Sequence, residues 1–306
     1  MPRYQKAILL YNQRAGQEDA QELLQKTLAK LAPEIVEFTI IQTLKQGDAE
    51  KICLEQSVDI DLLLIMGGDG TVHECVNGIM KQEGRPTIAI LPAGTCNDLS
   101  RGLQNETLDE ALEAILEGNT QAIDIGQQNE QYFSNFSGVG LITEASKEIE
   151  EETKDKFGKL GYVISAVRSL KEPQSFSYQL ETEEGETSTG EAVMILAMNG
   201  KYIGTVGLFE DNISLSDGFL HLFIIKEAGM TLIKNMYDQV RMDNGWLNDP
   251  EGLEILRSTS FKLKTTPSLD IDSDGEQNEQ TPVMYKLHKG ELTFICGMEE
   301  ANKPLN

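Results

Sequence analysis

Short apolar stretches alternate with amphipathic segments through the first 123 residues of the chain. The apolar stretches read as buried strands, at residues 7–11, 36–41, 60–66 and 87–91. The segments between them place apolar residues at helical spacing, as in residues 20–31. Strands without polar alternation that are separated by helices are typical of a parallel sheet covered on both faces. The sequence therefore predicts an α/β domain over residues 1–123.

The pattern changes at about residue 124. Further segments read as strands, at residues 131–136, 175–181, 191–198, 218–225, 260–264, 268–272 and 282–287. Helical patterns around residues 160–170 and 232–240 interrupt them. Alternating polar and apolar residues indicate strands with one solvated face, which are typical of antiparallel sheets. Residues 124–291 are therefore predicted to form a β-rich domain, and the pattern leaves open where the last apolar run, 292–296, belongs.

The most specific local feature is a glycine-rich turn, Gly67-Gly68-Asp69-Gly70-Thr71, between a buried strand and a helical pattern. Glycines let the backbone approach a phosphate closely, and a helix N-terminus presents unpaired N–H groups to it. A capping box formed by Thr71 and Glu74 would need no ligand. That alternative leaves the glycines around the aspartate unexplained, so the turn is interpreted as a phosphate-binding site.

A second loop, Pro92-Ala93-Gly94-Thr95-Cys96-Asn97-Asp98, follows the next predicted strand. Taken alone, Thr95 with Asp98 could simply cap a helix. The carboxyl ends of parallel strands lie at the same edge of a sheet, where α/β proteins bind their ligands. Two such loops on neighbouring strands would form one groove, and the joint pattern favours a nucleotide.

The order and spacing of the motifs resemble the soluble bacterial diacylglycerol kinase-like lipid kinases, which are relatives of the eukaryotic diacylglycerol, ceramide and sphingosine kinases. The resemblance rests on Gly67 to Thr71, Pro92-x-Gly94-Thr95-x-Asn97-Asp98-Leu99-x-Arg101, Ser216-Asp217-Gly218 and Asp274-Gly275-Glu276. It implies a phosphofructokinase/NAD kinase-like parallel-sheet domain followed by an antiparallel β sandwich. It also implies that residues 292–306 return to the first domain, that ATP is the phosphate donor, and that a lipid hydroxyl is the acceptor.

The resemblance also assigns nucleotide contacts. These are Asn12, Thr43, Gly67, Gly68, Asp69, Gly70, Thr71, Val72, His73 and Thr95. Four features depart from the family pattern: proline is usual where Gln13 stands, asparagine is frequent at His73, the glycine-rich run after Asn199 is short, and a usual proline before the Asp217 motif is missing. The departures concern the acceptor preference more than the nucleotide site.

Phosphoryl transfer needs a group that accepts the proton of the attacking hydroxyl and a charge that neutralises the phosphates. By resemblance, Asp274 is the catalytic base, Glu276 orients it or shares its role, and Asp69 helps to organise the catalytic Mg²⁺. The segment around Asp274 also fits a polar hairpin turn, because Asp-Gly is a common hairpin sequence.

A separate, structural Mg²⁺ is implied by resemblance at residues 214–219. Its ligands would be the carboxylate of Asp217 and the carbonyl oxygens of Ser214 and Phe219. An ordinary turn without an ion is the alternative, because one carboxylate makes a weak site. The histidines do not form a ligand set by spacing, and His221, within a strand pattern, is interpreted as a surface residue.

The chain carries 50 acidic and 26 basic residues, a formal net charge of −24. This charge argues against nucleic-acid binding and against strong adhesion to an anionic membrane. No apolar run is long enough to span a membrane, and the cysteines show no disulfide or zinc spacing. We therefore expect a cytoplasmic protein in transient, peripheral contact with the inner face of the membrane, through the less acidic N-terminal region with Lys26 and Lys30. The family suggests a homodimer.

The leading hypothesis is an ATP- and Mg²⁺-dependent lipid kinase that forms phosphatidic acid from diacylglycerol. An NAD kinase-like enzyme shares the Gly-Gly-Asp-Gly-Thr turn, but its Thr-Pro-Thr-Gly-Ser-type segment is absent from this chain. A catalytically silent nucleotide-binding regulator is the third hypothesis, and the departures from the family pattern favour it.

Overall fold

The computed structural model describes residues 2–12, 20–143, 174–183, 185–204, 206–207, 213–226 and 252–297. The chain forms two compact units, residues 1–123 with 290–306, and residues 124–289. The second unit thus ends two residues before the expected position 291. The helical patterns predicted around residues 160–170 and 232–240 lie outside the described residues.

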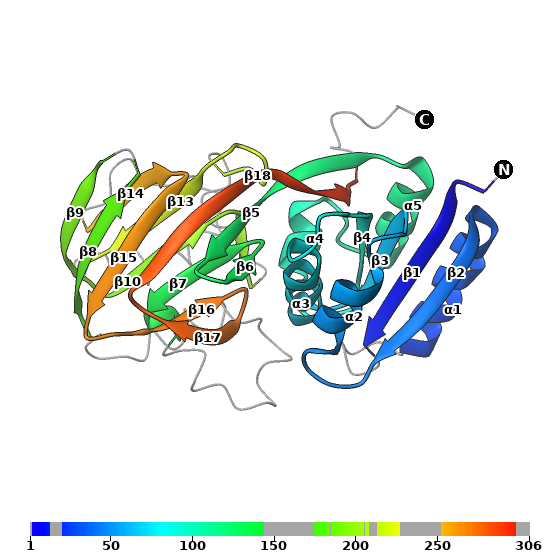
Figure 1. Cartoon of the computed structure of the whole chain (residues 1–306), viewed down its shortest axis with the longest axis horizontal. Helices are drawn as coiled ribbons and strands as arrows, with labels where there is room; N and C mark the ends of the chain where they lie inside the picture. Colours follow the sequence, from blue (N-terminus) through cyan, green and yellow to red (C-terminus); the bar gives the residue numbers. More distant parts are fainter. Residues whose placement is uncertain are drawn as a thin grey trace. The chain divides into compact units, whose positions relative to one another are not determined.

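The first unit is built on a parallel sheet (Figure 1), with strands in the order β2-β1-β3-β4-β18. The bounds are β1 (Tyr4–Asn12), β2 (Ile35–Thr43), β3 (Leu62–Gly67), β4 (Thr87–Pro92) and β18 (Val283–Ile295). Only the last residues of β18 belong to this unit, where Phe294 lies opposite Ile88 of β4. Every residue of β3 is buried, as expected for a central strand covered on both faces.

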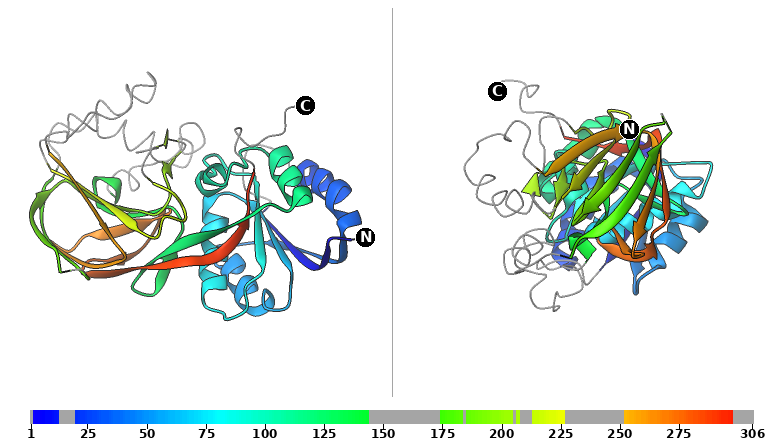
Figure 2. Two further views of the ribbon diagram at one scale, coloured as in Figure 1. Left: turned by 90° about the horizontal axis from the view of Figure 1, so that it is seen from above. Right: turned by 90° about the vertical axis from the view of Figure 1, so that its left-hand side faces the viewer.

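Helices cover both faces of this sheet, with α1 and α5 on one side and α2 and α3 on the other (Figure 2). The helices are α1 (Ala20–Leu31), α2 (Asp48–Gln56), α3 (Asp69–Met80), α4 (Asp98–Gly102) and α5 (Leu108–Glu117), with a short 3-10 helix η1 (Ala32–Glu34) after α1. A capping box of Thr107 and Glu110 starts α5, and Gly118, with φ of 79°, ends it. The predicted α/β class is confirmed.

The second unit contains two antiparallel sheets (Figure 1). One has the order β14-β13-β10-β7-β16-β17, and the other has the order β18-β15-β8-β9, with β5 paired to β18 and β6 paired to β5. The bounds are β5 (Thr120–Gln128), β6 (Gln131–Phe133), β7 (Phe136–Gly140), β8 (Phe176–Thr182), β9 (Thr187–Ala192), β10 (Met194–Met198), β13 (Leu220–Ile225), β14 (Leu253–Ser258), β15 (Ser260–Thr266), β16 (Asp270–Ser273) and β17 (Glu276–Gln280). A small separate ribbon joins β11 (Tyr202–Ile203) to β12 (Val206–Gly207).

Side chains from both sheets of the second unit form one hydrophobic core. Phe261 of β15 stacks on Tyr285 of β18 with ring centroids 4.5 Å apart, and Ile195 and Leu222 approach from the other sheet. This packing confirms the predicted β-rich antiparallel domain. Two predicted strands were wrong in detail, because 131–136 breaks into β6 and β7 and 191–198 breaks at Val193.

Candidate functional site

The carboxyl ends of neighbouring strands bring together the predicted nucleotide contacts of the first unit. Asn12 ends β1 opposite Thr43, which ends β2, and Gly67 ends β3 opposite Pro92 of β4. The hydroxyl of Thr43 donates to the carbonyl of Tyr11 over 3.4 Å. Since β1 lies between β2 and β3, these residues follow one another along a single edge, the edge at which α/β sheets bind ligands.

The two glycine-containing loops at this edge touch through their backbones. A Cβ added to Gly94 would lie 2.5 Å from the Cα of Gly68, which is closer than real Cβ atoms come. The N–H of Ala93 donates to the carbonyl of Gly67 over 3.1 Å. Glycine is therefore needed at 94 for the loops to close on one another, whereas a Cβ added to Gly68 would lie 3.2 Å from the Cα of Gly94.

The carboxylate of Asp69 links the two loops by hydrogen bonds. Its carboxylate oxygens accept the backbone N–H groups of Asn97 at 3.0 Å and Asp98 at 2.8 Å. These groups lie at the start of α4, where a negative charge stabilises the helix end. Asn97, in the left-handed region with φ of 51°, is the N-cap residue, so the alternative in which Thr95 caps the helix does not hold.

The alternative capping box of Thr71 and Glu74 is not formed either. The N-cap residue of α3 is Gly68, and Thr71 lies one turn further on. Glu74 reaches another helix instead, where its carboxylate accepts the N–H groups of Gly47 at 2.8 Å and Ala49 at 3.1 Å at the start of α2. The spacing was right for a capping box, but the helix begins three residues earlier than that box requires.

The glycine turn differs in accessibility along its length. Gly70 and Thr95 are exposed, and Gly68 and Asp69 are half-buried. Thr71, Val72 and His73 are buried, and the Nε2 atom of His73 lies 3.3 Å from the Nδ2 atom of Asn77. The first N–H groups of a helix have no intrahelical acceptor. The part of the turn that a phosphate can reach is thus the backbone at residues 68–70.

Replacement of Gly94 by alanine is expected to lower the free energy of unfolding by about 1–3 kcal/mol, because the new Cβ overlaps the backbone of Gly68. The loops must then separate, so we also expect weaker nucleotide binding. Chemical denaturation and calorimetric titration with ATP measure both effects. In the control Gly190→Ala, where the nearest atom to an added Cβ is 3.4 Å away, neither quantity should fall. Wild-type affinity and stability in Gly94→Ala would contradict the role of the loop contact.

In the second unit, Asp274 lies in a tight turn between β16 and β17. Ser273 pairs with Glu276 across the turn, and Asp274 and Gly275 have φ angles of 48° and 92°. Two residues of positive φ are what a two-residue hairpin of type I′ requires. The carboxylate of Asp272 accepts the N–H of Gly275 over 2.9 Å and supports the turn.

The carboxylate of Asp274 accepts hydrogen bonds from the segment that links β6 to β7. One oxygen accepts the N–H of Ser134 at 2.7 Å and its hydroxyl at 3.1 Å, and the other accepts the N–H groups of Asn135 and Phe136, each at 3.0 Å. A carboxylate offers about four lone-pair sites. Asp274 is 8% exposed and anchors this linker, whereas Glu276 at the end of the turn is half-buried.

Asn199 supports the same linker and was not identified from the sequence. Its side-chain amide, 1% exposed, donates to the carbonyls of Ser134 at 2.7 Å and Asp124 at 2.8 Å. Its backbone N–H donates to the carbonyl of Asn135 over 2.7 Å. The sequence signal was slight, because asparagine after a buried strand is common in turns.

The chain matches known families over both units. Residues 6–128 match the model of the diacylglycerol kinase catalytic domain, and residues 138–296 match the YegS C-terminal NAD kinase beta sandwich-like domain. The chain belongs to the diacylglycerol kinase family of lipid kinases. Its carboxyl-edge loops and its β sandwich are therefore those of a kinase family.

Relatives of this diacylglycerol kinase family member match it over nearly the whole length of the chain. A Staphylococcus aureus (strain JH9) protein named "Putative lipid kinase" is 32% identical over 287 residues, which cover 92% of this chain and 93% of that protein. A crystal structure of a "putative diacylglycerol kinase" from Bacillus anthracis superposes with a TM-score of 0.88 at 34% identity, covering 97% and 98% of the two chains. A second Bacillus anthracis diacylglycerol kinase structure gives a TM-score of 0.86 at 34% identity. In the described part of this chain, no helix is long and apolar enough to cross a membrane.

The structural Mg²⁺ that the family resemblance implied does not fit the residues at Asp217. Its carboxylate accepts the N–H groups of Ser214 at 3.1 Å and Phe219 at 2.9 Å, and lies 2.8 Å from Nε2 of His221. The carbonyl of Ser214, expected on the ion, accepts the N–H of Asp217 over 3.3 Å. The structure thus turns N–H groups, and not carbonyl oxygens, toward the carboxylate.

His221 is 3% exposed, so its interpretation as a surface residue was wrong. It lies on β13, which is buried along its whole length, and its ring is satisfied by Asp217. Burial raises the pKa of the Asp217 carboxyl, but hydrogen bonds from His221 and the neighbouring N–H groups outweigh burial and hold that pKa below its usual value. Among the described residues, no group of three or more His, Cys, Asp or Glu side chains could hold a metal.

Removal of divalent ions is therefore expected to leave the melting temperature of the nucleotide-free protein unchanged. The measurement is thermal unfolding in chelator and in Mg²⁺. Asp217→Asn should lower Tm in both solutions, because it weakens the contact with His221. A rise in Tm with Mg²⁺ that disappears in Asp217→Asn would contradict this prediction and would indicate that Mg²⁺ binds at this turn.

Proposed function

We propose that this chain is an ATP-dependent lipid kinase that transfers the γ-phosphate to a lipid hydroxyl, with diacylglycerol as acceptor and phosphatidic acid as product. Its family membership supports the kinase activity, and the names of its relatives support the lipid acceptor. The observation that carries the proposal is the backbone contact of Gly68 with Gly94 at the carboxyl edge of the sheet. Such an edge presents main-chain N–H groups to phosphates.

In this proposal, the backbone at residues 68–70 and the exposed Thr95 bind the phosphates of ATP. Asn12 and Thr43, further along the same edge, contact the rest of the nucleotide. Asp69 would hold the catalytic Mg²⁺, because carboxylate oxygens are ligands that this ion favours. When bound, the ion neutralises charge on the transferred phosphoryl group.

The lipid hydroxyl attacks the γ-phosphorus, the bond from that phosphorus to the bridging oxygen breaks, and ADP leaves. The hydroxyl proton must pass to a base. We assign this proton to the Asp274–Glu276 turn, with Asp274 as the base and Glu276 sharing its role. The enzyme would act in the cytoplasm at the inner face of the membrane, where its acceptor is dissolved.

The test is incubation of the purified full chain with labelled ATP, Mg²⁺ and a panel of lipids, followed by identification of the labelled product. Labelled phosphatidic acid from diacylglycerol is the expected result. Transfer to ceramide or a sphingoid base alone would keep the kinase and change the acceptor. Transfer to none of the lipids, or transfer to NAD in a parallel incubation with NAD as the acceptor, would overturn the proposal.

A second candidate, the catalytically silent nucleotide-binding regulator, is favoured by one observation. The carboxylate of Asp274 already accepts four hydrogen bonds, which leaves little capacity for a substrate hydroxyl. A silent regulator would bind ATP in a calorimetric titration and transfer no label to any lipid. A kinase would bind ATP and also transfer the label.

A further inference from the structure

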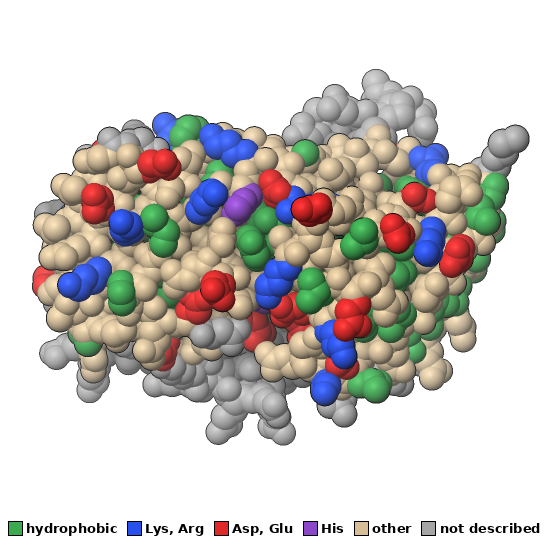
Figure 3. All heavy atoms as spheres, in the orientation of Figure 1, with side chains coloured by type: hydrophobic (Ala, Val, Ile, Leu, Met, Phe, Trp, Pro, Cys, Tyr) green, Lys and Arg blue, Asp and Glu red, His purple; other side chains and the backbone are tan. Residues whose placement is uncertain are grey.

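Many acidic side chains of this protein are solvated surface charges. Figure 3 shows Asp and Glu side chains scattered among Lys and Arg side chains on the face drawn there. Glu74 differs from these, because it is half-buried and its carboxylate accepts two backbone N–H groups, those of Gly47 and Ala49. The two donors lie at the start of α2, whereas Glu74 lies on α3, the helix that begins with the phosphate-binding turn. This carboxylate therefore connects that helix to its neighbour.

The first turn of α2 has no side-chain cap of its own. Its N-cap residue is Gly47, with φ of 85°, which has no side chain to accept the N–H groups that lack an intrahelical acceptor. Glu74 supplies that acceptor from α3. A negative charge at a helix N-terminus is also stabilised by the helix dipole. Glu74 thus does for α2 what an N-cap side chain does within a single helix.

The segment before α2, residues 44–48, is folded around a second carboxylate, and we call it the β2–α2 loop. Asp48 accepts the N–H groups of Leu44 at 3.0 Å and Lys45 at 3.1 Å. The hydrogen bond from the N–H of Leu44 lowers the pKa of the Asp48 carboxyl below its usual value. Asp48 therefore holds the first residues of the loop, and Glu74 holds its end.

The β2–α2 loop leaves an apolar side chain in solvent at the edge of the sheet. Leu44 is 72% exposed, and it follows Thr43, the last residue of β2. The base of a nucleotide has a flat π-face that packs on side chains. A nucleotide bound along this edge would therefore cover Leu44, provided that the loop stays at a fixed place beside the phosphate-binding turn.

Other contacts hold α2 and α3 together without Glu74. A Cβ added to Gly78 of α3 would lie 2.7 Å from the Cβ of Cys53 on α2, so the two helices approach closely. Nζ of Lys81 pairs with the carboxylate of Glu50 at 2.5 Å. Loss of the Glu74 carboxylate should therefore loosen the first turn of α2 and the β2–α2 loop, and leave the helix pair packed.

We propose that Glu74 is a positioning residue of the nucleotide site, which holds the β2–α2 loop at a fixed place relative to the phosphate-binding turn. The phosphates would contact the backbone at residues 68–70, and the nucleoside would contact Thr43 and Leu44. A loop that is ordered in advance pays no ordering entropy when the ligand binds, so the affinity is higher. The inference rests on the nucleotide site of the proposed function, but not on transfer to a lipid.

The test is calorimetric titration of the full chain with ATP and with inorganic tripolyphosphate, which has the phosphates but no nucleoside. If the loop of Glu74→Ala keeps the bound arrangement in about 10% of molecules, ATP should bind about 10-fold more weakly than to wild type. The affinity for tripolyphosphate should stay at its wild-type value, because residues 68–70 are unchanged. Equal weakening for the two ligands, or wild-type affinity for ATP, would overturn the proposal.

A double-mutant cycle shows whether Glu74 acts through the loop. Leu44→Ala should also weaken the binding of ATP and spare that of tripolyphosphate. Because both substitutions affect one contact, the double variant Leu44→Ala/Glu74→Ala should bind ATP within about 2-fold of the single variant that binds it more weakly. Additive losses would mean that Glu74 acts elsewhere, and would overturn the proposal.

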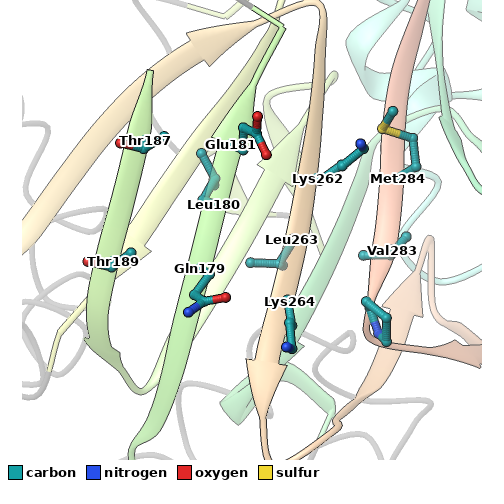
Figure 4. Close-up of a pocket in the computed structure, with 11 residues that line it drawn as sticks. Gln179, Leu180, Glu181, Thr187, Thr189, Lys262, Leu263, Lys264, Val283 and Met284 are labelled. Carbon is teal, nitrogen blue, oxygen red and sulfur yellow. The ribbon is translucent and has the colours of Figure 1, made fainter. Parts of the chain in front are cut away.

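Two control variants match the chemical change. Asp61→Ala also removes a carboxylate that accepts two backbone N–H groups in the first unit, and it should lose stability but bind ATP as wild type does. Glu181→Gln removes an exposed charge from β8 in the second unit, where Figure 4 shows Glu181 beside Lys262 at a hollow of about 520 Å³. It should change neither quantity. A loss of ATP affinity in either control as large as that in Glu74→Ala would overturn the proposal.

The lipid assay separates this inference from the proposed function. In an active enzyme, Glu74→Ala should raise the KM for ATP about 10-fold and leave kcat within about 2-fold of wild type. If the variants show the expected binding of ATP but wild type transfers label to no lipid, Glu74 keeps its role and the kinase proposal fails. If wild type phosphorylates diacylglycerol while Glu74→Ala binds ATP as wild type does, the reverse holds.

Discussion

Replacement of Asp274 by alanine is expected to lower the free energy of unfolding by about 3–5 kcal/mol and to abolish phosphoryl transfer. The buried N–H groups of Ser134, Asn135 and Phe136 would lose their acceptor, and each unsatisfied buried donor costs about 1–3 kcal/mol. The turn would then no longer hold the β6–β7 linker. Chemical denaturation gives the stability, and the labelled-ATP assay, at a temperature where the variant is folded, gives the turnover.

The conservative variants separate the anchoring role of this turn from proton transfer. Asp274→Asn keeps the shape of the side chain but replaces one acceptor oxygen by a donor, so it should lose stability as well as turnover. Glu276→Gln, at a half-buried position, should leave the stability within about 1 kcal/mol of wild type. If Glu276→Gln loses turnover while Asp274→Asn retains some, Glu276 is the base and Asp274 is an anchor. Full turnover in Asp274→Ala would contradict both roles.

Replacement of Asp69 by alanine is expected to reduce turnover by at least 100-fold and to lower the free energy of unfolding by about 2–3 kcal/mol. The carboxylate makes two charge-assisted hydrogen bonds, to the N–H groups of Asn97 and Asp98, and such bonds contribute about 1.5–3 kcal/mol. Its loss frees the second loop from the first and removes the carboxylate proposed to hold Mg²⁺. Steady-state kinetics with varied ATP and Mg²⁺, together with denaturation, measure these effects.

The matched control for Asp69 is Asp61→Ala. Asp61 also accepts two backbone N–H groups, those of Gln5 at 2.7 Å and Lys6 at 2.9 Å. It precedes β3, whereas Asp69 follows it, so the two carboxylates act at opposite edges of the sheet. Asp61→Ala should lose stability but keep its KM for ATP. Equal kinetic effects in the two variants would show that Asp69 acts only through the stability of the first unit.

The elements that the sequence predicted well are strands whose residues are nearly all buried. β3 and β4 lie in the middle of a covered sheet, so their residues are almost all apolar and the strands stand out. β5 was not predicted, although it contains the buried Ile123 and Ile125, because polar residues surround them. The break between β6 and β7 was not predicted either. It depends on the carboxylate of Asp274, which lies 138 to 140 residues away in sequence, and a local pattern carries no information on such a partner.

The sequence alone determined the α/β and β-rich classes and the two glycine-containing loops, because apolar periodicity and glycine spacing are local properties. The family was indicated by the resemblance of its motifs. Only the tertiary structure decided what each polar group does. The carboxylate of Asp69 accepts a backbone N–H at the start of α4, and that of Asp274 accepts one from the β6–β7 linker. The carboxylate of Asp217 lies within hydrogen-bond distance of His221. Each carboxylate was identified as an acid with a role in the site, but a carboxylate binds whatever donors the fold brings within about 3 Å of it. Those donors lie on other elements, so their identity follows from packing and not from the neighbouring residues in the chain.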